Sequence, residues 1–157
     1  AISAQAIPKL SHFQAQDLAN TAWSLATLAM RDVPFLAAIS AESISRLADF
    51  RPQNLTNLAW AFATLEVQNL PLLAAIAAAA LTRLTEYAPQ DLSTTAWSVA
   101  TMALFHNPLM EAIASASLNR IGEFSTQHLA NTSWSFATLV VFDKPLLSSL
   151  SAAFISN

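Results

Sequence analysis

The stretch PQNLTNLAWAFATL, residues 52–65, decides the fold of this chain because related versions of it recur at a constant spacing. Its tryptophan belongs to a series that steps by 37 residues, and the proline that follows the stretch, Pro71, belongs to a second series with the same step. The tryptophans stand at positions 23, 60, 97 and 134, and the prolines at 34, 71, 108 and 145. A fixed period of this length is typical of solenoids, in which each unit buries its apolar face only against its neighbours.

The sequence of each repeat unit predicts two helices. Alanine and leucine dominate the composition, there is one glycine, and the alternation typical of strands is absent. Pro52 suits the first turn of a helix that we expect over residues 53–65, named helix A. A second helix, helix B, is expected over residues 71–87, with Asp32 and Asn69 as N-caps in their units. We therefore predict an all-α solenoid of stacked antiparallel helix pairs, with about four units and nine helices that begin and end with helix B.

Residues 1–157 are expected to form a single solenoid segment. The units run roughly over 15–51, 52–88, 89–125 and 126–157, and residues 1–14 are the end of a preceding unit. Because atypical polar capping units are missing, the segment is interpreted as an excerpt from a longer array. The apolar fraction of 54% and mean hydropathy of +0.43 are high. No membrane span is expected, since the longest uncharged windows, such as 92–110, are interrupted by polar residues and proline.

The sequence argues against catalysis. His12, His106 and His128 fall at different phases of the repeat, and no clustered carboxylates or metal-ligand spacing accompany them. The absence of cysteine excludes disulfides and thiolate metal sites, and one glycine cannot build a phosphate-binding loop. We expect no catalytic residue, metal, cofactor or small-molecule substrate, and we interpret the histidines as surface or loop residues.

A helical wheel places a narrow polar strip on helix A. Stacking would align the strips of successive units, so that one set of hydrogen-bonding groups per unit could contact a base or a peptide; a solvated face is the alternative. The tryptophans lie at the border of the strip, where packing between units is favoured over a role as stacking platforms for bases. The candidate RNA-binding residues are Asn20, Ser24, Asn57, Thr94, Ser98, Asn131 and Ser135.

Helix B carries a repeating basic residue that has an acidic residue three positions later. This spacing puts both side chains on one face of the helix, so each unit is expected to neutralise its own arginine on the outer face. An arginine paired in this way is a poor phosphate ligand. The expected pairs are Arg46 with Asp49, Arg83 with Glu86, and Arg120 with Glu123.

The stretches QDLANTAWSLATL (16–28) and PLLAAIAAAALTRLTEYAPQDL (71–92) resemble the octotricopeptide repeats of algal and protist organelle proteins. The resemblance covers essentially the whole chain, although Thr126 replaces the proline of the motif in the last unit. It implies paired helices stacked into a superhelix, a location in the chloroplast or mitochondrion, and binding of organellar transcripts or ribosomal RNA. If one unit contacts about one base, the resemblance favours Asn20, Asn57, Thr94 and Asn131 as the contacting residues.

Two functions remain open at this stage. The first is binding of single-stranded organellar RNA, which the net charge of −3 disfavours, because RNA affinity normally depends on a basic surface. The second is a protein scaffold within a large organellar assembly such as a ribosome or a photosynthetic or respiratory complex. High apolarity and uncharged polar strips suit this second function.

Overall fold

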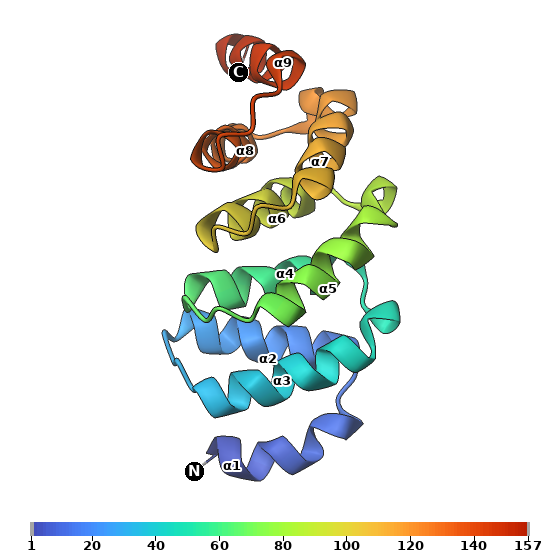
Figure 1. The fold of residues 1–157 in the computed structure, drawn as a ribbon, viewed down its shortest axis with the longest axis vertical. Coiled ribbons are helices and arrows are strands. Elements are labelled where there is room, and N and C mark those ends of the chain that lie inside the picture. Colours follow the sequence, from blue (N-terminus) through green and yellow to red (C-terminus); the bar gives the residue numbers. More distant parts are fainter. Residues whose placement is uncertain (1, 157) are drawn as a thin grey trace.

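The computed structural model describes residues 2–156 and contains, over this range, nine α-helices and no strand (Figure 1). The helices stack in chain order along the long axis, which confirms the predicted all-α solenoid. The first helix of the units is α2 (Ala15–Thr27), α4 (Pro52–Thr64), α6 (Pro89–Thr101) and α8 (Thr126–Thr138). The second helix is α1 (Ile2–Ala6), α3 (Val33–Ser45), α5 (Leu70–Leu81), α7 (Asn107–Asn119) and α9 (Lys144–Ser156).

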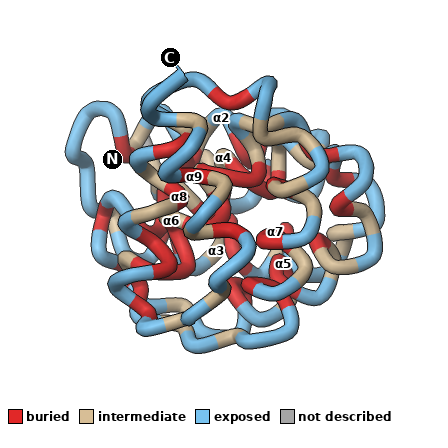
Figure 2. Tube along the Cα trace, turned by 90° about the horizontal axis from the view of Figure 1, so that it is seen from above, coloured by how far each residue is buried: buried red, intermediate tan, exposed pale blue. Residues whose placement is uncertain are grey.

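The two helices of a unit belong to two layers. Successive A helices pack on one another from α2 to α8, and successive B helices pack on one another from α3 to α9. Buried residues gather between the helices and exposed residues lie around the outside (Figure 2). Each A helix therefore has a neighbour on both flanks in the middle of the array, which determines how much of its surface stays accessible.

The predicted N-caps of helix B are confirmed. The side-chain oxygens of Asp32 and Asn69 accept the backbone N–H groups of Phe35 and Leu72, both at 3.1 Å. These bonds satisfy donors that have no partner inside the helix. The same position holds His106, whose Nδ1 accepts the N–H of Leu109 at 3.2 Å, so this histidine lies in a loop, as expected, and caps α7.

Helix B ends earlier than the sequence predicted. The helix expected over residues 71–87 ends at Leu81, and a 3-10 turn follows at Leu84–Glu86. The backbone of Tyr87 is extended and its side chain is fully buried. Its equivalents Phe50 and Phe124 are also extended, and at most 3% of their surface is exposed. Turning the aromatic side chain into the core requires the chain to leave the α-helix, and the residue before Pro89 is in turn held extended by the proline.

The core divides into two clusters along the array. One extends from Leu10 to Ile76 and the other from Ala77 to Leu150. A small third cluster of Ala63, Leu73 and Met102 bridges the second and third units. The junction between α4 and α6 thus lies at a division of the core, and the candidate functional site described below opens at this junction.

Each A helix ends in a turn with left-handed backbone. The residues at this position have φ between 50° and 55°, and none of them is glycine: Ala29, Glu66, Ala103 and Val140. The N–H of the next residue closes the turn onto the carbonyl five residues earlier, as from Val141 to Phe136 at 2.9 Å. This is the Schellman geometry that usually selects glycine.

Candidate functional site

One face of every A helix carries the same polar and aromatic residues. Four positions hold recurring residue types: glutamine at i, asparagine or threonine at i+4, tryptophan at i+7 and threonine at i+11. An α-helix places these four positions on one side. Because the A helices stack side by side, these faces adjoin, and we call their combined surface the tryptophan face. It comprises Gln16, Gln53, Gln90 and Gln127; Asn20, Asn57, Thr94 and Asn131; the four tryptophans; and Thr27, Thr64, Thr101 and Thr138.

The tryptophans form two pairs. The ring centroids of Trp23 and Trp60 are 6.4 Å apart, and those of Trp97 and Trp134 are 6.5 Å apart, with interplanar angles of 32° and 33°. Trp60 and Trp97 do not form a pair of this kind, although they occupy neighbouring A helices. The row of indoles is therefore interrupted once, between α4 and α6.

A hollow of about 420 Å³ opens at this interruption. Trp60 and Trp97 both line it, together with residues of all four A helices. A volume of this size lies in the range of about 300–1,000 Å³ that is usual for ligand pockets. We take this hollow, which we call the central hollow, as the candidate site.

The tryptophans combine packing with exposure. Packing between units was the favoured interpretation, and Trp60 and Trp97 do pack partly against core residues. Trp23 and Trp134 nevertheless keep 45% and 46% of their surface exposed. An indole that is half covered by protein and half open to solvent can still offer one face to a ligand.

The structure separates the candidate residues into two groups. Asn57, Thr94 and Asn131 line the central hollow, whereas Asn20 and Ser24 line a shallower hollow next to Phe13. Ser98 and Ser135 are fully buried, and their hydroxyls donate to the carbonyls of Thr94 and Asn131 at 2.8 and 2.6 Å. These two serines are not accessible to a ligand, because the preceding A helix covers that flank.

Glutamines and tryptophans of the tryptophan face were absent from the predicted site. Gln53, Gln90 and Gln127 are exposed and line the central hollow beside the indoles. Their strict recurrence every 37 residues was the available signal. An exposed glutamine that every unit repeats contributes nothing to the core, so its recurrence favours a role at the surface.

Among the described residues that line the central hollow, Asp91 is the one with an ionisable side chain. Its carboxylate accepts the backbone N–H of Ala88 at 3.1 Å in the first turn of α6, and burial raises the pKa of this carboxyl. In the preceding unit Asn54 makes the equivalent bond to the N–H of Arg51 at 3.1 Å. No cationic side chain of residues 2–156 lines the central hollow, so its chemistry is stacking and hydrogen bonding and not the neutralisation of phosphate.

The repeating arginines lie at the junctions between units. Arg83 and Arg120 pair with Glu86 and Glu123 as predicted, at 3.0 and 2.6 Å. The hydrogen bond from Arg83 lowers the pKa of Glu86. The prediction for Arg46 was wrong, because it pairs with Glu42 at 3.1 Å in place of Asp49.

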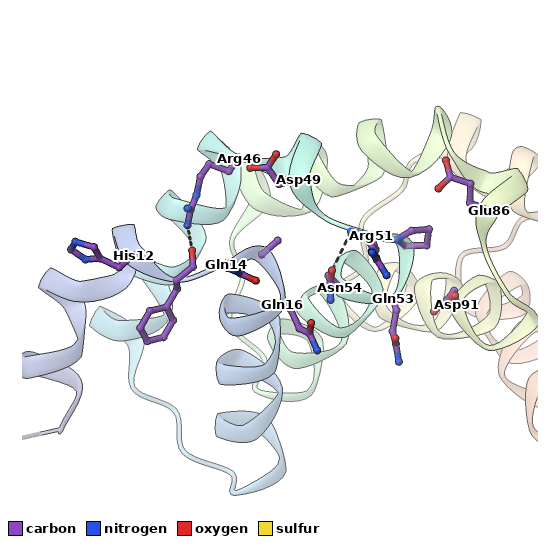
Figure 3. A pocket seen from close by; sticks show the side chains of 13 residues that line it. His12, Gln14, Gln16, Arg46, Asp49, Arg51, Gln53, Asn54, Glu86 and Asp91 are labelled. Carbon is purple, nitrogen blue, oxygen red and sulfur yellow. Dashed lines mark hydrogen bonds between the residues drawn. The ribbon is translucent and has the colours of Figure 1, made fainter.

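Each of these arginines also donates to a carbonyl of the preceding unit. Arg46 reaches the carbonyl of Phe13 at 2.8 Å, a bond drawn as a dashed line in Figure 3. Arg83 and Arg120 donate in the same way to the carbonyls of Phe50 and Tyr87, both at 2.5 Å. The recurring arginine therefore joins consecutive units, and this role explains its periodicity without a nucleic acid.

A second hollow, of about 770 Å³, opens where the chain passes from helix B to helix A (Figure 3). Arg46 and Arg51 line it together with Asp49, Glu86 and Asp91. Opposite charges alternate around it, and Arg46 is already engaged with Glu42 and Phe13. It does not concentrate positive potential, so it is a weaker candidate for an anionic ligand than its size suggests.

Within residues 2–156 no group of three or more histidine, cysteine or acidic side chains is placed to hold a metal ion. No helix in this range combines the length and the apolarity that crossing a membrane requires.

Comparison with known proteins gives a family. Residues 2–155 match the family model described as RNA-editing substrate-binding complex 6 protein. No curated protein matches the chain. The match agrees with the expected helical-repeat class and with an RNA-binding complex, but it does not support the octotricopeptide family or a chloroplast location.

Proposed function

This chain belongs to the family of RNA-editing substrate-binding complex 6 proteins, and from that premise we propose that its tryptophan face binds single-stranded RNA as a non-enzymatic subunit of such a complex. The complex is mitochondrial in kinetoplastids, and we propose the mitochondrion as the compartment of this chain. The observation that carries the proposal is the alignment of half-exposed indoles with uncharged amide and hydroxyl groups on adjoining A helices. Aromatic side chains of this kind stack on bases, and amides bond to base edges.

The electrostatics determine what kind of RNA contact is proposed. None of the described residues that line the central hollow is cationic, and Arg46, Arg83 and Arg120 already donate to carbonyls. Contacts to bases must then outweigh contacts to phosphates. The logarithm of affinity for single strands falls with the logarithm of salt by about 0.7 for each phosphate neutralised. We expect a slope between zero and about −1, which corresponds to at most one or two phosphate contacts.

The test is a fluorescence-anisotropy titration of labelled single-stranded RNA over a series of salt concentrations. An RNA of about ten nucleotides is longer than four units need at one base per unit. Replacing Asn57 and Asn131 by alanine is expected to weaken binding several-fold without loss of helical circular dichroism. Asn119→Ala is the matched control, because Asn119 is an exposed asparagine on α7 in the other layer. Unchanged affinity of the Asn57 and Asn131 variant, or a steep salt slope, would place the RNA elsewhere.

A protein-docking function is the second candidate, and a different surface favours it. Large apolar side chains are exposed at the turns from helix A to helix B, among them Phe105 at 67% and Phe142 at 81%. They occupy the same phase of consecutive units, so they lie along one edge of the array. Exposed apolar groups in a row are typical of protein interfaces. Changing both to serine is expected to release the chain from its complex, measured as a shift to lower mass on size exclusion, and to leave RNA affinity unchanged.

A further inference from the structure

The interruption between Trp60 and Trp97 is the feature of the tryptophan face that the repeat does not explain. All four tryptophans have the same register in sequence, yet two pairs form and the middle pair does not. The division of the core coincides with this place, since the second and third units meet through the small cluster of Ala63, Leu73 and Met102. The array therefore holds its two central indoles apart, and the central hollow opens between their helices.

We propose that the central hollow receives one unstacked nucleobase, which contacts the indoles of Trp60 and Trp97, and that Asp91 selects a base with an exocyclic amino group. The inference rests on the proposed RNA-binding function and adds the position and identity of one base to it. Unstacked bases in single-stranded RNA bind aromatic side chains through their faces.

The size and the walls of the hollow suit a base. Its volume of about 420 Å³ accommodates a planar ring together with several waters, given that one water occupies about 30 Å³ of liquid. Gln53 and Asn57 of α4 and Gln90 and Thr94 of α6 supply donors and acceptors around it. Entry of a base would cover indole surface that now contacts water, which is favourable for stacking.

The deeper residues determine which base fits. Thr56 is buried, and its hydroxyl is hydrogen-bonded to the hydroxyl of Thr95 at 3.2 Å. Asp91 lines the same hollow, and its carboxyl group, when ionised, accepts hydrogen bonds and donates none. Adenine, cytosine and guanine carry an amino group that can donate to it, as carboxylates accept from the amino group of cytosine in nucleic-acid complexes. Uracil has no amino group, and its one donor on that edge, the ring N3–H, lies between two carbonyl oxygens that a carboxylate repels.

The first experiment uses the unchanged protein. An oligouridine and the same RNA with one central adenosine are titrated by fluorescence anisotropy, followed by a version with an abasic residue in place of the adenosine. We expect the adenosine to raise affinity severalfold over uridine, and the abasic residue to lower it about tenfold below the adenosine RNA. Abasic residues at the flanking positions should have a much smaller effect.

Variants assign the effect to residues. Trp97→Leu should remove most of the difference between the adenosine and abasic RNAs, whereas Trp134→Leu should retain it, because Trp134 is equally part of a pair but does not line the hollow. Asp91→Asn should remove the preference for adenosine over uridine while the abasic penalty persists. Helical circular dichroism shows whether each variant is folded.

The outcomes separate the two proposals. If no RNA binds to the unchanged protein at low salt, the proposed function fails and this inference fails with it. If RNA binds with equal abasic penalties at every position, the RNA-binding function stands and the base site is refuted. Equal affinity for the adenosine and uridine RNAs refutes the selection by Asp91.

Discussion

Replacing Val140 by glycine is expected to stabilise the protein although the substitution removes a whole side chain. Val140 has a φ of 55° in the turn that ends α8, and 86% of its surface is exposed. A left-handed backbone costs an L-residue roughly 1–2 kcal/mol, and the cost is highest for branched side chains. Because the side chain makes almost no contacts, its removal sacrifices little burial. Glycine avoids the steric cost at this position.

The net gain follows from two opposing contributions. Glycine has more freedom in the unfolded chain, which costs about 0.5–1 kcal/mol of stability. Subtracting this from the relief of the left-handed backbone leaves a gain of about 0.75 kcal/mol, within a range of about 0–1.5 kcal/mol. Val140→Ala keeps a Cβ in the same conformation and is expected to gain less than glycine. The effect is a change in the free energy of unfolding without any new contact.

The assay is urea unfolding followed by helical circular dichroism, with a higher midpoint and an unchanged slope as the expected result. Ala130→Gly is the matched control, since Ala130 is exposed in the interior of α8. There glycine should cost about 1 kcal/mol. If Val140→Gly destabilises the protein as Ala130→Gly does, the turn is not left-handed in solution and the argument is refuted. A smaller gain is expected for Ala103→Gly, with φ of 50°, because alanine has no branched side chain.

Three further predictions concern the junctions and the central hollow. Arg46→Met should lower the free energy of unfolding, measured in urea, by about 1.5–3 kcal/mol, because it removes a charged donor to the carbonyl of Phe13. Glu42→Gln, which removes only the ion pair, should change the free energy of unfolding by less than about 0.5 kcal/mol. Tyr87→Phe should raise the melting temperature or leave it unchanged, since the buried hydroxyl of Tyr87 has no partner and its burial without one costs about 1–3 kcal/mol. Burial raises the pKa of Asp91, so the folded state binds the proton of this carboxyl group more tightly than the unfolded state does. The contribution of Asp91 to stability is therefore fully present below its pKa in the unfolded chain and is lost as the pH rises through its pKa in the folded protein. Asp91→Asn should remove this loss of stability with rising pH in unfolding curves measured across the acid range. The side-chain oxygen of asparagine can still accept the N–H of Ala88, as Asn54 accepts the equivalent N–H in the preceding unit.

Repetition made the architecture predictable from the sequence. The period of 37 residues, the prolines and the caps at Asp32 and Asn69 are local signals, and the structure confirms each of them. The end of helix B was missed because Tyr87 shares an apolar side with the helix on a wheel. Its burial instead requires a turn, which local periodicity does not encode.

The candidate site was only partly predictable for a geometric reason. A wheel describes an isolated helix, whereas an A helix in the array has neighbours on two flanks. Ser98 and Asn57 both belong to the predicted strip, yet Ser98 is covered by α4 and Asn57 opens into the central hollow. The separation of Trp60 from Trp97 depends on how the second and third units pack, so an identical register in sequence could not reveal it.

The arrangement of charge explains how an acidic chain can belong to an RNA-binding complex. Four of the five arginines donate to backbone carbonyls of a neighbouring unit, three of them to the preceding unit and Arg31 to the carbonyl of Glu66 in the following unit at 3.2 Å. Positive charge is thereby used to hold the array together, and little of it remains for phosphates. Under the proposed function, a surface of indoles and amides would bind bases with modest affinity and weak salt dependence. In a complex, subunits that contact phosphates would supply affinity, while the proposed site at Asp91 would determine which base occupies the central hollow.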